Sequence, residues 1–199
     1  MLRRRKADVA EDLPDKQEQV LERDLDRKHR KVYQTYLQRE RQKVLGLLGD
    51  LEKNRFEIFR SLTLLRQASL DVALVDPKHQ DIPSTKLDAL TEQITSLVAE
   101  GHRTLVFSQF TRFLDAARER LERAGFACAY LDGKTRNRAA VLAEFKNGAA
   151  PVFLISLKAG GFGINLTEAD YCICSTRGGT RQPRHRPSTA STASTRPAT

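Results

Sequence analysis

The sequence predicts an α/β fold built on a parallel β-sheet, on three observations. Four short apolar runs recur in the second half of the chain, helical patterns separate them, and polar residues or glycines follow most of the runs. Short continuous apolar runs are typical of strands that are buried on both faces, as parallel strands are. Strands that alternate with helices of this length indicate crossover connections and a sheet flanked by helices.

Residues 1–75 precede this unit and are predicted to form a charged helical segment. Apolar residues recur near helical spacing in two sets, which leave Arg, Lys, Glu and Gln on the opposite faces. The first set is Val32, Leu37, Val44, Leu47 and Leu48, and the second is Phe56, Phe59, Leu62 and Leu65. Two prolines and several polar residues then indicate a linker over residues 76–85.

The α/β unit itself is predicted for residues 86–174. Ser84 or Thr85 can cap a first helix, which Gly101 ends. The expected strands are 104–107, 127–131, 152–155 and 171–174, with helices over 113–125 and through 141–145. Ligands of such sheets bind beyond the carboxyl ends of the strands, so the loops at those ends are the candidate sites.

Composition and charge narrow the class of protein. Of the 199 residues, 40% are hydrophobic and 30% charged, which fits a soluble globular protein without a membrane partner. Three scattered cysteines and four scattered histidines predict no disulfide framework and no metal site. The net charge of +9 fits contact with a polyanion such as DNA or RNA, and it also fits an ordinary solvated basic surface, so composition alone leaves both interpretations open. No signal-peptide apolar region follows the basic N-terminus, so we expect a cytoplasmic location.

The loop after the third strand, residues 156–167, is the most informative stretch. Gly160, Gly161 and Gly163 would let backbone N–H groups approach an anion closely. Lys158 adds a cation suited to a phosphate, and hydroxyl and amide side chains surround it. A tight glycine turn with no ligand explains the same residues, and their types alone leave both interpretations open.

The loop after the second strand holds a weaker signal. Gly133, Lys134 and Thr135 resemble the end of a phosphate-binding P-loop. The first glycine of that motif would stand at position 128, which is Cys128. Without that glycine the loop lacks the cradle that wraps the phosphates, which disfavours an independent P-loop phosphotransferase.

The order of these strand-end motifs resembles the second RecA-like lobe of Swi/Snf-type DNA translocases, the remodeller branch of helicase superfamily two. The motifs are Val-Phe-Ser-Gln-Phe at 106–110, Leu-Asp-Gly-x-Thr at 131–135, and Ser-Leu-Lys-Ala-Gly-Gly-Phe-Gly-Ile-Asn-Leu-Thr-Glu-Ala-Asp at 156–170. Residues near the N-terminus, within 1–16, match the segment that links the two lobes of that family. The resemblance covers residues 1–173.

In that family two lobes close on ATP and move along duplex DNA, so the resemblance implies roles for individual residues. The residues implied to lie near the phosphates of the tracking strand are Ser108, Gln109, Thr135, Ser156 and Lys158. Those implied to line the nucleotide cleft between the lobes are Gly161, Gly163 and Asn165. The implied cofactors are ATP and Mg²⁺, held mostly by the first lobe. The implied partners are duplex DNA, that missing first lobe, and RNA polymerase or nucleoprotein.

Two family features are missing from the sequence. It has neither the glycine-lysine loop nor the Asp-Glu metal box of the first lobe, so we expect a lobe truncated at both ends. We therefore expect no catalytic residues and no ATP hydrolysis by the chain alone. A noncatalytic module that binds nucleic acid or a protein partner is the alternative.

Residues 175–199 depart from the family pattern. The family continues with Leu-Asp-Pro-Trp-Trp-Asn-Pro, whereas this chain has no tryptophan. If residues 177–180 are encoded CGT-GGT-GGA-ACC, a frame displaced by one base contains TGG-TGG-AAC, which spells Trp-Trp-Asn. We therefore interpret these residues as a frameshifted translation of the sixth helicase motif. Its arginine finger is lost, and a disordered basic tail carrying +5 charge is expected in its place.

Overall fold

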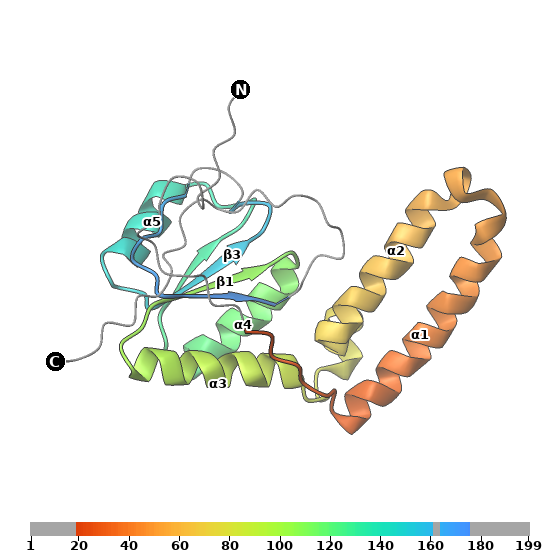
Figure 1. Ribbon diagram of the computed structural model, residues 1–199, viewed down its shortest axis with the longest axis horizontal. Coiled ribbons are helices and arrows are strands. Elements are labelled where there is room, and N and C mark those ends of the chain that lie inside the picture. The colour runs from red at the N-terminus through yellow and green to blue at the C-terminus, as the bar shows by residue number, and fades with distance from the viewer. Residues whose placement is uncertain (1–18, 161–163, 176–199) are drawn as a thin grey trace.

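A four-stranded parallel sheet forms the centre of the molecule (Figure 1). The computed structural model describes residues 19–160 and 164–175. The strands are β1 (Thr104–Ser108), β2 (Cys128–Leu131), β3 (Val152–Ser156) and β4 (Tyr171–Cys174), in the spatial order β2-β3-β1-β4. The predicted α/β class and the four predicted strands are confirmed.

The two central strands, β1 and β3, are buried along their whole length. Their apolar runs carry side chains that pack on both faces of the sheet, which explains why they lack polar alternation. In register, Thr104 pairs with Val152 at one end and Ser108 with Ser156 at the other. The two strands therefore end side by side, and the loops that follow them begin side by side.

Helices cover both faces of the sheet. On one face, α3 (Thr85–Ala99) and α4 (Thr111–Arg123) enclose a core of leucine, isoleucine and phenylalanine side chains. On the other face, α5 (Arg138–Lys146) and the buried side chains of Ala159, Ile164, Leu166 and Ala169 enclose a second core around Phe145 and Phe153. Gly101 and Gly125 follow α3 and α4 with φ of +83° and +88°, a conformation that glycine adopts without steric cost.

A helical hairpin stands beside this lobe (Figure 1). It consists of α1 (Arg27–Leu47) and α2 (Leu51–Leu70), joined by a short 3-10 turn, Leu48–Asp50. Asp26 and Asp50 cap the two helices: a carboxylate oxygen of Asp26 accepts a hydrogen bond from the Lys28 N–H at 2.7 Å, and Asp50 accepts one from the Lys53 N–H at 3.1 Å. Two further 3-10 turns, Val72–Leu74 and Pro77–His79, connect the hairpin to the lobe.

The predicted buried face of α2 is wrong. Phe56, Phe59 and Leu62 are exposed, whereas Ser61 and Ala68 are buried. The half-buried Leu65 lies on the same side as these two residues by helical spacing. The large side chains of the predicted face are therefore mostly turned to solvent, and the buried face carries small residues beside half-buried large ones.

The base of the hairpin is tied to the lobe by buried contacts. Leu70 and Leu74 belong to the first core of the sheet, so that core extends to residues before the predicted linker. The Ser84 hydroxyl donates a hydrogen bond to the Leu70 carbonyl at 3.0 Å, and the Arg112 guanidinium donates one to the Leu74 carbonyl at 3.0 Å. Within the hairpin, the fully buried His29 places Nε2 2.8 Å from the Ala68 carbonyl oxygen.

Among the helices of the described ranges, none has both the length and the apolar character needed to cross a bilayer.

Candidate functional site

Three loops meet at the carboxyl edge of the sheet. β3 lies between β2 and β1, and the last residue of β2, Leu131, pairs with Ile155. Beyond the strands, the backbone N–H of Leu157 donates a hydrogen bond to the Ser108 carbonyl at 2.9 Å. The strands point towards the side of the lobe on which the hairpin stands (Figure 1). Three of the predicted strand-end motifs therefore share one edge.

The two serines at this edge are buried. Ser108 is 0% and Ser156 3% exposed, and the Ser108 hydroxyl oxygen accepts a hydrogen bond from the Phe110 N–H at 3.1 Å. These side chains therefore shape the loops in this conformation and lie beneath the surface. Gln109 is half-buried, and Lys158 is exposed. Lys158 is thus the predicted phosphate contact that a ligand can reach directly.

The turn after β3 explains one of the glycines. The N–H groups of Ala159 and Gly160 both donate to the Ser156 carbonyl, at 2.9 and 2.8 Å. A Cβ at Gly160 would lie 2.9 Å from Cγ2 of Ile155 and 3.1 Å from Cε1 of Phe107, both in the core. Gly160 is therefore required by packing.

The remaining residues of the predicted nucleotide cleft are described only in part. Gly161 and Gly163 lie outside the described residues. Asn165 lies within them and is exposed, just after the buried Ile164. Its amide is open to solvent, where a ligand could reach it.

The loop after β2 is held by hydrogen bonds to the side chain of its own Asp132. A carboxylate oxygen of Asp132 accepts hydrogen bonds from the Lys134 N–H at 2.9 Å and from the Thr135 hydroxyl at 3.0 Å. The Thr135 hydroxyl oxygen in turn accepts one from the Asp132 N–H at 3.0 Å. A carboxylate thus occupies the place where a P-loop would hold a phosphate, which agrees with the weak sequence signal there. Thr135 is half-buried in this turn.

Sequence reasoning missed two arginines at this edge. Arg138, in the first turn of α5, donates a hydrogen bond to the carbonyl of Ala159 and so connects α5 to the loop after β3. Arg136 is exposed in the preceding loop, as is Lys134. Together with Lys158, these side chains make the edge basic. The sequence does contain a signal for these basic residues, because Lys-x-Arg-x-Arg at 134–138 places a cation at every second position.

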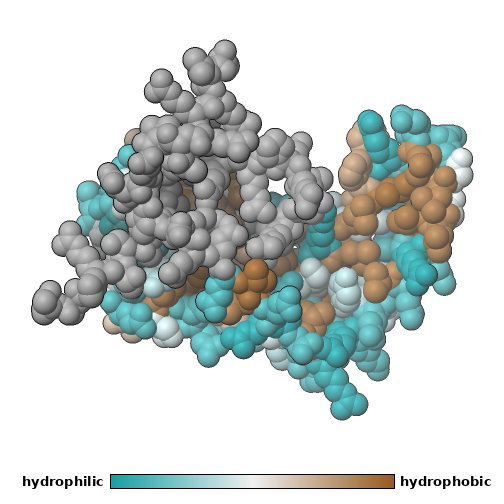
Figure 2. Space-filling view, viewed as in Figure 1, coloured by the Kyte–Doolittle hydropathy of each residue, from teal (hydrophilic) through white to brown (hydrophobic). Residues whose placement is uncertain are grey.

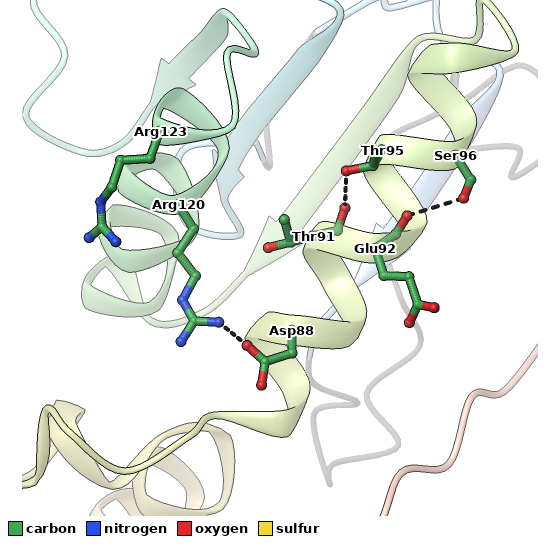
Figure 3. Close-up of a pocket in the computed structure, with 7 residues that line it drawn as sticks. All are labelled: Asp88, Thr91, Glu92, Thr95, Ser96, Arg120 and Arg123. Atoms are coloured by element: carbon green, nitrogen blue, oxygen red, sulfur yellow. Dashed lines mark hydrogen bonds and ion pairs between the residues drawn. The ribbon is translucent and has the colours of Figure 1, made fainter.

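A surface depression lies elsewhere, on the outer side of α3 and α4 (Figure 3). It is open and holds about 550 Å³. Asp88 and Arg120 pair across it, and the Thr95 and Ser96 hydroxyls donate to backbone carbonyls of their own helix. These four side chains are thus engaged with one another or with the backbone of their own helix.

The described residues include no cluster of metal-ligating side chains. No group of three or more His, Cys, Asp or Glu side chains within residues 19–160 and 164–175 could hold a metal ion. The one P-loop-like turn is occupied by the Asp132 carboxylate. No catalytic step is therefore assigned to this edge, whose chemistry is that of exposed cations and amide groups.

This arrangement, a parallel sheet with helices on both faces and basic loops at its carboxyl edge, is that of a RecA-like lobe. Residues 85–184 match the family of the helicase conserved C-terminal domain, and residues 1–74 match the SNF2-related domain. The chain belongs to the helicase C-terminal family, in its Snf2-type branch. The matched range extends into the segment interpreted as frameshifted, which lies outside the described residues from 176 onward.

Similarity to known proteins, in sequence and in structure, supports this assignment. The chain is 34% identical over 184 residues to the chromodomain-helicase-DNA-binding protein 1-like of Danio rerio, with 87% of this chain and 18% of the relative covered. It resembles the SWI2/SNF2 ATPase core domain of Sulfolobus solfataricus at 26% identity and a TM-score of 0.69, over 88% of this chain and 38% of that one. The C-terminal domain of a SWI2/SNF2 ATPase of the same organism shares the fold, with a TM-score of 0.64 at 24% identity, over 77% and 68% of the two chains.

The chain spans less than a fifth of the length of the Danio rerio relative. The names of these relatives refer to DNA binding and chromatin and give no support to the expected cytoplasmic location.

Proposed function

We propose that this chain is the C-terminal motor lobe of an ATP-dependent translocase on duplex DNA, and that the carboxyl edge of its sheet faces the DNA backbone. The observation that carries the proposal is the meeting of three loops at that edge with exposed Lys134, Arg136 and Lys158. Exposed cations on short loops bind phosphates without reading bases, as a protein that moves along DNA requires. Lys158 contacts a phosphate directly, and the half-buried Gln109 and Thr135 contact the DNA backbone beside it. Ser108 and Ser156 lie beneath them and position the loops near the phosphates.

In the longer protein, Gly161, Gly163 and Asn165 border the cleft in which ATP and Mg²⁺ bind. The nucleotide is held there mostly by a first lobe. Snf2-type ATPases use both cofactors, and this chain supplies only one wall of the site.

Salt-dependent DNA binding tests the proposal. The binding constant for a labelled duplex of about 20 base pairs would be measured by fluorescence anisotropy at several salt concentrations, for two unrelated sequences. We expect equal affinity for both sequences, and Lys158→Ala should reduce the salt slope by about 1. Lys53→Ala removes an exposed lysine near the tip of the hairpin and serves as the matched control. Equal effects of the two substitutions would refute the assignment of the edge.

We also infer that residues from about 175 onward are a frameshifted translation, supported by the Trp-Trp-Asn that the displaced frame permits. Resequencing the gene across codons 170–199 tests this. Codons at 177–180 that cannot spell Trp-Trp-Asn in the displaced frame would rule it out.

A further inference from the structure

The hairpin displays an apolar surface that no described part of the chain covers. Within the described residues, ten large hydrophobic side chains are exposed, and seven of them lie on α1, α2 and their connection. Six form what we call the hairpin surface: Leu45, Leu48, Leu51, Phe56, Phe59 and Leu62. Phe56 is 75% exposed and Phe59 59%. Figure 2 shows hydrophobic side chains gathered over the hairpin.

Helical spacing makes the α2 part of this surface continuous. Phe56, Phe59 and Leu62 follow one another at intervals of three, which places consecutive members side by side on one side of the helix. Leu45, Leu48 and Leu51 add the tip, where Gly46 and Gly49 have open space around them. Such a concentration of exposed apolar side chains marks an interaction site more often than chance exposure.

The hairpin that carries this surface is strongly basic. Residues 27–70 contain eleven Lys or Arg and four Asp or Glu, a net charge of +7. Three arginines of α2, Arg55, Arg60 and Arg66, are exposed and form no ion pair with any described residue. The Arg55 guanidinium lies 5.4 Å from the centre of the Phe56 ring, so a cation and an aromatic ring are presented together.

We propose that the hairpin surface is a docking site for an acidic amphipathic helix of a partner protein. Leucines or aromatic residues on one side of such a helix would cover Phe56, Phe59 and Leu62, and its flanking carboxylates would pair with Arg55, Arg60 and Arg66. This is helix-in-groove recognition with complementary charge.

Two other occupants fit the surface less well. A second copy of the chain would bring one +7 hairpin against another, and like charges oppose that contact. Duplex DNA would satisfy the arginines, but its phosphates and sugars offer little to cover exposed phenylalanines and leucines. The docking proposal is independent of the DNA contacts proposed for the carboxyl edge.

The probe for a test is a pair of synthetic peptides of about 18 residues with identical Leu and Glu content. One has leucines at helical spacing, and the other has them alternating. Binding to the full chain would be measured by isothermal titration. We expect the helical peptide to bind, and we expect the affinity of the alternating peptide to be lower by about tenfold or more.

Variants locate the binding. Phe56→Ser with Phe59→Ser, and separately Arg55→Gln with Arg60→Gln and Arg66→Gln, should each weaken the helical peptide about tenfold or more. Val20→Ser with Leu21→Ser is the matched control, since these two residues are exposed and apolar but lie outside the hairpin. Circular dichroism would confirm that each variant retains its helix content.

Several outcomes would overturn the proposal. These are equal binding of the two peptides, an effect of the control variant as large as that of the phenylalanine variant, and self-association that the phenylalanine variant abolishes. Tighter binding to phosphatidylserine vesicles or to duplex DNA than to the helical peptide, lost in the phenylalanine variant, would assign the surface to that other ligand instead.

Discussion

Gly160 is a residue whose identity follows from packing alone. An added Cβ would press against the buried side chains of Ile155 and Phe107. We expect Gly160→Ala to lower the free energy of unfolding by about 1–3 kcal/mol, measured by urea denaturation. Gly133→Ala is the control, since nothing lies within 4 Å of a Cβ there. Equal stability of the two variants would contradict the packing argument.

Cys128 is expected to be the least reactive of the three cysteines. Burial, with a smaller contribution from the charge of Glu122, raises the pKa of its thiol to about 12. At pH 8 it therefore holds about a thousandfold less thiolate than an ordinary cysteine.

Iodoacetamide labelling followed by mass spectrometry would measure the rate at each cysteine. Because the thiolate is the reactive form, alkylation of Cys128 should keep rising with pH above 9. Cys172 and Cys174 are exposed and provide the comparison. A rate for Cys128 that levels off below pH 9 would contradict the raised pKa.

At the scale of elements, the hairpin depends on one buried histidine. His29 is fully buried on α1 and joins the Ala68 carbonyl of α2. His29→Ala would leave a cavity and an unpaired carbonyl, at a cost of about 2–4 kcal/mol. We expect amides of α1 and α2 to exchange hydrogen faster, while those of β1 and β3 keep their protection.

Hydrogen exchange with mass spectrometry resolves these two regions. Thr35→Ala is the control on the same helix, because the Thr35 hydroxyl only bonds back to the Lys31 carbonyl at an exposed position. Faster exchange across the whole lobe in His29→Ala would mean that the hairpin and the sheet unfold together.

The strands and the helices that cover the sheet could be predicted from sequence because their signals are local. The apolar run at 152–155 by itself predicts a buried strand, and the glycine after α4 by itself predicts the end of that helix. The buried side of α2, which includes Ser61 and Ala68, could not be predicted, because the large apolar Phe56 and Phe59 lie on the exposed side of the helix.

Part of the candidate site could likewise be predicted from the sequence, and part could not. The loops at the strand ends follow from the α/β class. The burial of Ser108 and Ser156 does not, because it depends on the β1–β3 register and on the turn that Phe110 makes. The turn closed by Asp132 likewise becomes visible only in the structure, although the missing P-loop glycine pointed the same way.

For the whole molecule, we expect no ATP hydrolysis by this chain alone, with or without duplex DNA. The sequence contains no glycine-lysine loop, and the Asp132 carboxylate holds the Lys134 N–H that a phosphate would need. Phosphate release would be measured in both conditions. Turnover that Lys134→Ala abolishes would show that the turn after β2 is a working phosphate site after all.

We propose that DNA lies along the carboxyl edge of the sheet, and hydrogen exchange measured with and without a duplex shows whether it does. The chain has two basic regions, this edge and the +7 hairpin, so the position of protection distinguishes them. We predict slower exchange at residues 133–138 and 157–160 when DNA is added, with α1 and α2 unchanged. Protection confined to α1 and α2 would contradict the claim and make the hairpin the DNA-binding element.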